Sequence, residues 1–214
     1  MKSAAIGVRV HSGWGALVAV AGQHGEEEII DRRKVVVIDA KKPGAVQPYH
    51  YVQKIEFPAA ERHLTQCAID SNRLAREALG QTSAELRQRG YSLSGTAILL
   101  SSARPLPDLE EIMASHALIH TAEGEFFRQA FRHAFESLEV PVTGIRERDL
   151  EERAQEAFGK LATQVRKNID SMRRLLGPPW TQDEKMAALA AAIVLAEAHN
   201  ARGLGTRSVR VRGA

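Results

Sequence analysis

The sequence has few of the residues that mark disulfide-bonded, metal-stapled or base-stacking proteins. Its 214 residues include a single cysteine, Cys67. One cysteine excludes a disulfide framework and a cysteine-based zinc cluster. Aromatic residues make up only 5% of the chain, which argues against the broad base-stacking surfaces of proteins that bind single-stranded nucleic acid.

Long hydrophobic runs are also missing. The longest apolar stretch, Met186 to Ala196, is too short to span a bilayer. The first residues run into charged positions after a few apolar ones and lack the core and cleavage pattern of a signal peptide. We therefore expect a cytoplasmic protein without a membrane partner.

The composition that remains is that of an ordinary globular protein, with 44% hydrophobic and 26% charged residues. The length favours a single domain over residues 1–200, followed by a basic tail over residues 201–214. The net charge is +3, and no acidic residue follows Glu197. A basic tail of this kind either binds nucleic acid or acidic surfaces, or keeps the domain soluble. Its positive charges are Arg202, Arg207, Arg210 and Arg212.

Hydrophobic periodicity predicts an α/β protein. In chain order we expect strands over 4–10, 16–21 and 29–39, a helix over 59–89, a strand over 96–100, a helix over 108–138, a strand over 140–145, and helices over 148–176 and 181–200. Three meandering strands followed by βαβ units give one mixed five-stranded sheet between helices, in the order β-β-β-α-β-α-β-α-α. The wholly apolar strand 96–100 should lie in the buried middle of the sheet.

Short patterns refine this outline. Asp108 with Glu111, and Thr181 with Glu184, are spaced as capping boxes that start helices. The three prolines between residues 41 and 58 indicate an irregular connection. We expect Trp14, in the first turn, to fill the core rather than to stack on a ligand.

Three segments resemble the Holliday-junction resolvase branch of the ribonuclease H-like superfamily. The turn from Val10 to Val18 is similar to the family's first hairpin, where an aspartate precedes a glycine turn. Glu123-Gly124 through Val140-Pro141-Val142 resembles the helix that leads into its fifth strand. Pro178 to Ala190 is similar to its final alanine-rich helix, which begins with aspartates. The resemblance implies a ribonuclease H-like fold over most of residues 4–200.

The departures from this family concern its catalytic carboxylates. These nucleases hold two metal ions with acidic residues from several elements. Here His11 takes the place of the first-strand aspartate, and Ser101 or Ser102 that of a glutamate after the fourth strand. Asp183 and Glu184 remain near the start of the last helix, and one carboxylate pair is too little for two hard cations. We expect a degenerate site without two-metal nuclease activity.

A polar stripe is the other candidate site. His116, His120 and Glu123 are spaced i, i+4 and i+7 on a helix and share one face. Two histidines four residues apart can ligate one divalent metal ion, with Glu123 or His11 completing the shell. Alternatively, Arg104, Arg128 and backbone N–H groups bind an anion, or the polar groups only satisfy one another. The hypothetical binding cleft comprises His11, Ser12, Ser102, Arg104, His116, His120, Glu123 and Arg128.

Two functions are compatible with these patterns. One is a non-catalytic ribonuclease H-like domain that binds nucleic acid or a protein partner through the polar cleft. The other is a metal-dependent phosphoester hydrolase with a rebuilt His/Glu site. The sequence lacks the Gly-x-Ser-x-Gly and Gly-x-x-x-x-Gly-Lys motifs, which excludes a nucleophile elbow and a P-loop.

Overall fold

The structure, a computed structural model, describes residues 1–23, 25–101 and 105–209. Its strands are β1 (Lys2–His11), β2 (Trp14–Ala21), β3 (Glu28–Val36), β4 (Tyr91–Leu100) and β5 (Val142–Arg146). Its α-helices are α1 (Pro48–Val52), α2 (Phe57–Gln88), α3 (Leu109–Ala114), α4 (His116–Ser137), α5 (Leu150–Phe158), α6 (Ala162–Ser171), α7 (Arg173–Leu176) and α8 (Gln182–Val209). Two short 3-10 turns are η1 (Glu147–Asp149) and η2 (Gly159–Leu161).

The five strands form one mixed sheet in the order β3-β2-β1-β4-β5. The first three strands are antiparallel neighbours, as the meander predicted. β4 is parallel to both β1 and β5 and has a buried run from Gly95 to Leu99. The predicted fold class and the buried position of the fourth strand are therefore confirmed.

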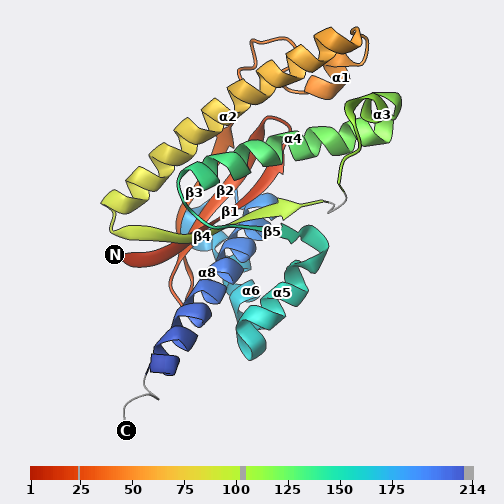
Figure 1. Cartoon of the computed structure of the whole chain (residues 1–214). Helices are drawn as coiled ribbons and strands as arrows, with labels where there is room; N and C mark the ends of the chain where they lie inside the picture. Colours follow the sequence, from red (N-terminus) through yellow and green to blue (C-terminus); the bar gives the residue numbers. More distant parts are fainter. Residues whose placement is uncertain (24, 102–104, 210–214) are drawn as a thin grey trace.

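Helices cover the sheet on both faces, and each face has its own hydrophobic core (Figure 1). On one face α4 packs against β1 and β4 and α2 packs against β3 and β4, with Phe127, Phe131 and Phe135 fully buried. On the other face α8 packs against alternate residues of β1, β2 and β4, and α5 and α6 pack against α8. Because side chains alternate along a strand, both faces require apolar residues, which explains the nearly continuous apolar sequence of β2.

The alanine-rich helix α8 lies very close to β1. A Cβ atom built on Gly7 would stand 1.9 Å from the carbonyl oxygen of Ala187, so only glycine fits there. Residues 187–193 of α8 are all buried, and most of them are alanine. Small side chains on both elements let the helix backbone approach the strand, and this brings the first turn of α8 to the carboxyl end of β1.

Three helix predictions need correction. The connection over 41–58 contains α1, which begins at Pro48, because proline fits the first turn of a helix. The helix expected over 108–138 breaks at Ser115, whose hydroxyl caps α4 by accepting from the Leu118 amide. The helix expected over 148–176 breaks at Gly159, which has φ +55°. Helix α8 continues as far as Val209, into the basic tail of residues 201–214, which we call the basic segment.

Both predicted capping patterns mark helix starts. The Asp108 carboxylate accepts from the Glu111 amide at 3.0 Å and begins α3. The Thr181 amide donates to the Glu184 carboxylate at 2.6 Å, while the Glu184 amide donates to the Thr181 hydroxyl at 3.4 Å. None of the helices within the described residues is both long enough and apolar enough to cross a bilayer.

Candidate functional site

Charged side chains gather where β1 and β5 end. These strands run in the same direction, so their carboxyl ends meet at one edge of the sheet. Arg9 and His11 share the α8-facing side of β1 with Gly7, because alternate residues point to the same face. Glu147 follows β5 directly, and Asp183 lies in the first turn of α8. We call Arg9, His11, Glu147 and Asp183 the charged cluster.

Arg9 is the centre of the charged cluster. Its Nε and Nη2 donate to the two carboxylate oxygens of Glu147 at 2.9 and 3.0 Å. Its Nη1 donates to Oδ1 of Asp183, and His11 Nε2 lies 2.9 Å from Oδ2 of the same carboxylate. The hydrogen bond to Glu147 raises the pKa of Arg9 above its ordinary value, and Asp183 adds to this effect. Partial burial acts in the opposite direction but is outweighed. The guanidinium is therefore a fixed positive charge.

The charged cluster does not fit the pair of metal ions that the resolvase resemblance implies. Divalent hard cations require free carboxylate oxygens from several elements. Both oxygens of Glu147 and both oxygens of Asp183 are already bonded to Arg9 or His11. The sequence interpretation assigned the key substitution to His11 and missed Arg9 and Glu147. The sequence did contain a signal for Arg9: side chains two residues apart on a strand point to the same face, so Arg9 had to lie beside His11.

Aromatic and basic side chains extend the charged cluster across the hairpin. The rings of His11 and Trp14 stack with centroids 4.4 Å apart and an angle of 14°. Lys34 Nζ lies 4.4 Å from the Trp14 ring centroid, and the lysine is exposed. Trp14 is only half-buried and belongs to no hydrophobic core among the described residues. The expectation that it fills the core is wrong, because the hairpin turn places it at the end of the sheet.

Arg128 occupies the same end of the sheet from the α4 side. It is 6% exposed, and its Nη2 donates to the hydroxyl of Ser101, just after β4, at 2.5 Å. Glu125 lies 3.5 Å from Arg128 Nε, which makes no hydrogen bond. Burial lowers the pKa of Arg128, partly offset by the charges of Glu125 and Glu147. Gly124 makes room for this guanidinium, since a Cβ there would stand 2.8 Å from Arg128 Nη1.

The hypothetical cleft also included Ser12, Ser102 and Arg104. Ser12 is exposed in the hairpin turn between β1 and β2. Ser102 and Arg104 lie outside the described residues, so the hypothesis that they line the cleft stays a prediction. Ser101 and Arg128 confirm that the end of β4 is polar.

The histidine stripe has the predicted geometry but faces a partner that the sequence did not suggest. His116 and His120 lie in the first turns of α4, with their Nε2 atoms 3.0 Å apart. His50, from α1, packs its ring against both, with centroids 5.4 Å from His116 and 4.7 Å from His120. One ligand nitrogen from each of the three rings lies within 4.8 Å of the others. We call His50, His116 and His120 the histidine triad.

Glu123 lies behind the histidine triad and completes the predicted stripe. Its side chain is 4% exposed, and Oε2 lies 2.8 Å from His50 Nδ1, a contact without hydrogen-bond geometry. Its Oε1 accepts from the backbone amide of His50 at 3.2 Å. Glu123 therefore fixes the ring and backbone of His50. His11 takes no part in this group, because its contacts within the described residues are with Trp14 and Asp183.

The sequence did not point to His50 because the helix that carries it was assigned to an irregular connection. His50 and His116 are far apart in the sequence, so no helical or strand periodicity connects them. Two signals were present: Pro48 at a helix start, and the histidine within the Tyr49-His50-Tyr51 segment.

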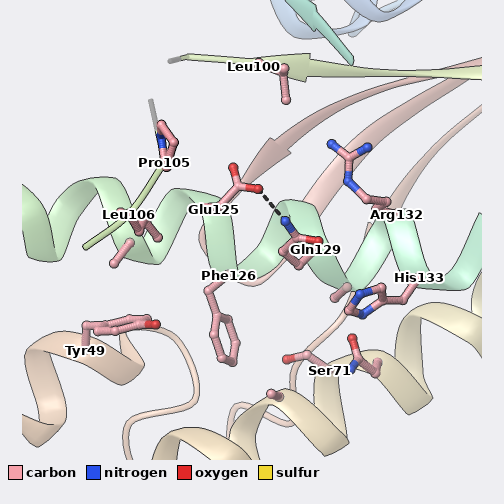
Figure 2. A pocket seen from close by; sticks show the side chains of 14 residues that line it. Tyr49, Ser71, Leu100, Pro105, Leu106, Glu125, Phe126, Gln129, Arg132 and His133 are labelled. Atoms are coloured by element: carbon pink, nitrogen blue, oxygen red, sulfur yellow. Dashed lines mark hydrogen bonds between the residues drawn. The ribbon is translucent and has the colours of Figure 1, made fainter. Parts of the chain in front are cut away.

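A cavity of about 590 Å³ lies beside α4, between α2, the end of β4 and Tyr49 of α1. Figure 2 shows Phe126 near Tyr49, with Gln129 donating to Glu125 further along the helix. Tyr49 and Phe126 meet edge to face with centroids 6.2 Å apart. Burial, with a smaller contribution from the Glu123 charge, raises the pKa of the Tyr49 hydroxyl. Tyr49 thus links the cavity to the surroundings of the histidine triad.

Comparison with solved structures shows which fold this is. RuvC of T. thermophilus in complex with a Holliday junction substrate superposes with a TM-score of 0.51 at 12% identity, covering 94% of this chain and 95% of RuvC. Thermus thermophilus RuvC in a second structure gives a TM-score of 0.50 at 13% identity, over 93% and 95% of the two chains. The chain has a RuvC-like ribonuclease H fold. The sequence itself matches no family model and no curated protein.

Likeness to RuvC at this level of identity concerns the fold. It confirms the ribonuclease H-like assignment made from the three sequence segments, over nearly the whole length of both chains. The chemistry at the polar end of the sheet depends on the side chains that this chain places there, above all Arg9 between Glu147 and Asp183.

Proposed function

We propose that this chain is a RuvC-like domain that binds nucleic acid in the cytoplasm at the polar end of its sheet and does not cleave it by a two-metal mechanism. The observation that carries the proposal is Arg9, whose guanidinium lies between Glu147 and Asp183 and engages three of their four oxygens. Because both carboxylates are bound to Arg9, no metal is needed to hold them, and the positive charge that an approaching phosphate requires comes from the exposed lysine and arginine side chains beside them.

The surroundings of the charged cluster support a nucleic-acid ligand. Lys34 is exposed beside the Trp14 ring, and the side chain of Arg148, next to Glu147, is 75% exposed. Lysine and arginine side chains that contact phosphates supply most of the non-specific affinity of such proteins. T. thermophilus RuvC binds a Holliday junction with a chain of similar fold, which makes four-way junction DNA the first ligand to test.

The two alternatives are weaker. A phosphoester hydrolase needs its metal beside groups that hold the reacting phosphate, yet the histidine triad contacts neither Glu147 nor Asp183 within the described residues. A protein partner at the same cleft remains compatible with the fold, but the exposed Lys34 and Arg148 beside the charged cluster favour a polyanion.

The experiment is a fluorescence-anisotropy titration of labelled four-way junction and matched linear duplex with the full chain. We expect binding of the junction, weakened several-fold by Lys34→Ala and with a shallower dependence on salt concentration, because the substitution removes one phosphate contact. The matched control is Lys167→Ala, which removes the same charge from an exposed position on α6 and should leave binding unchanged.

The same DNA, incubated with the protein and Mg²⁺ or Mn²⁺, should stay intact. Cleavage that a chelator abolishes and that Asp183→Asn abolishes would overturn the non-catalytic proposal. Equal loss of binding in Lys34→Ala and Lys167→Ala would overturn the location of the interface.

A further inference from the structure

We propose that the histidine triad, His50, His116 and His120, is a binding site for one divalent transition-metal ion of the zinc class, with Glu123 as the positioning residue behind it. The site is separate from the charged cluster, so this inference stands independently of nucleic-acid binding.

The spacing of the three rings matches a single ion. A zinc ion bound to imidazole nitrogens at 2.0–2.1 Å in tetrahedral geometry places neighbouring nitrogens about 3.3 Å apart. The Nε2 atoms of His116 and His120 are 3.0 Å apart, and all three ligand nitrogens lie within 4.8 Å of one another. Small rotations of the three imidazole side chains would bring their nitrogens to the distances that one bound ion requires.

The backbone holds these ligands in place from two elements. His116 and His120 are one helical turn apart on α4, and the Ser115 cap fixes the start of that helix. His50 comes from α1, which is anchored by Val52, a fully buried residue packed with Ala60 and Leu64 of α2. The site therefore joins the connection between β3 and α2 to the first turns of α4.

Glu123 supplies the support that a metal-bound imidazole needs. Metal-binding histidines almost always turn their second ring nitrogen toward a carboxylate or carbonyl, which orients the ring. Here Glu123 Oε2 lies 2.8 Å from His50 Nδ1, without hydrogen-bond geometry. The carboxylate covers the Nδ1 side of the ring, so Nε2 is the nitrogen open to an ion. The carboxylate also holds the backbone of the same residue through the His50 amide.

The charge of Glu123 is the second, independent observation. A carboxylate buried to 3% exposure requires a positive partner or a metal nearby. Among the described residues no lysine or arginine pairs with Glu123, and its contacts are His50 and the neighbouring Tyr49. A divalent ion on the far nitrogen of His50 would supply the missing positive charge.

One side of the histidine triad is exposed to solvent, which indicates that water would complete the coordination of the ion. His116 and His120 are exposed while His50 is half-buried, so water reaches the ion and can take the fourth position. Exposed imidazoles gain little from bonding to each other, because water offers the same hydrogen bonds. Three nitrogen ligands and no thiolate favour zinc, copper or nickel over magnesium or calcium.

The test uses the full chain, freed of metal with a chelator and then titrated with Zn²⁺ by calorimetry, with Co²⁺ as the spectroscopic probe. We expect one equivalent of Zn²⁺, visible d–d absorption from bound Co²⁺, and a higher melting temperature with Zn²⁺ than without it. His120→Ala, at an exposed position, should weaken Zn²⁺ at least 100-fold and abolish the thermal shift. Glu123→Gln should weaken it about 10- to 100-fold while stoichiometry stays at one.

His63→Ala is the matched control. His63 Nε2 lies 3.4 Å from the Cys67 sulfur, which makes this pair the rival zinc ligand set on the chain. Zinc affinity in His63→Ala should equal that of the unsubstituted chain. Loss of binding in His63→Ala with retention in His120→Ala, or absence of binding at micromolar Zn²⁺ in the unsubstituted chain, would overturn the proposal. Should His50→Ala fail to fold, His116→Ala and His120→Ala still decide it.

Discussion

At the scale of single residues, Arg9 determines the charge balance at the polar end of the sheet. Two carboxylates, Glu147 and Asp183, face each other there, and neither has a metal-binding oxygen free while the guanidinium is present. Because its pKa is raised, Arg9 stays charged up to and beyond the ordinary pKa of arginine. The pairing is therefore not lost on raising the pH from neutral to moderately alkaline values.

Replacing Arg9 should convert this edge into a cation site. In Arg9→Ala the two carboxylates lose their shared partner, and we expect a loss of about 1–3 kcal/mol in the free energy of unfolding. Millimolar Mg²⁺ should then raise the melting temperature of Arg9→Ala but not of the unsubstituted chain. Thermal melts with and without Mg²⁺ measure both effects.

Arg73→Ala provides the comparison for that experiment. Arg73 pairs with Glu77 one turn along α2, and both side chains are more than half exposed. Such pairs contribute at most about 1 kcal/mol. A Mg²⁺ effect of equal size in the unsubstituted chain would contradict the view that Arg9 excludes the ion.

At the scale of elements, the contact between β1 and α8 places the charged cluster. Gly7 lies beneath Ala187, and Asp183 is one helical turn before Ala187 on α8. Arg9 is two residues beyond Gly7 on the same face of β1. A change in the distance between strand and helix would therefore move the guanidinium away from its carboxylates.

We expect Gly7→Ala to be strongly destabilising. The added methyl group would stand 1.9 Å from a backbone oxygen, so the helix must shift, at a cost of about 1–3 kcal/mol or more. Gly80→Ala is the control, because a Cβ there meets no atom within 4 Å and alanine stabilises a helix by up to about 1 kcal/mol. Urea denaturation of both variants measures the difference. Equal midpoints would refute the close-packing argument.

The helices and strands differ in how well the sequence predicted them. The glycine turns between the first strands, the β-branched residues 35–38 and the apolar run of β4 are local signals, and the sheet was predicted from them. The break at Ser115 was missed because apolar periodicity continues across a single capping residue. The α1 helix was missed because prolines dominate its segment, and with it the histidine that completes the triad. Pairings between distant elements, such as His50 with Glu123 or Arg9 with Glu147, leave no periodic trace in one sequence.

At the scale of the whole molecule, charge is distributed unevenly. The net charge of +3 is small, but four arginines follow the last acidic residue of the sequence. At the polar end of the sheet Lys34 and Arg148 are exposed, whereas Arg9 is paired with Glu147 and Asp183. The two groups should contribute differently to nucleic-acid binding. Residues at the sheet would position one stretch of backbone, whereas the basic segment adds sequence-independent attraction.

The dependence of binding on salt distinguishes these contributions. Each phosphate contact made by a lysine or arginine adds about 0.9 to the negative slope of log K against log salt concentration. Lys34→Ala should therefore reduce the slope by about one. Replacing Arg202, Arg207, Arg210 and Arg212 together by glutamine should reduce it by about two to four. Anisotropy titrations at several salt concentrations measure both slopes.

The shape of the DNA adds the deciding comparison. If the basic segment acts only by charge, the fourfold glutamine variant should lose affinity for four-way junction and linear duplex by the same factor. Lys34→Ala should lose more affinity for the junction, because Lys34 belongs to the surface that we propose as the junction-binding site. Equal losses on both DNA forms for Lys34→Ala would mean that the sheet edge binds backbone without regard to shape. An unchanged slope in the fourfold variant would remove the basic segment from the interface.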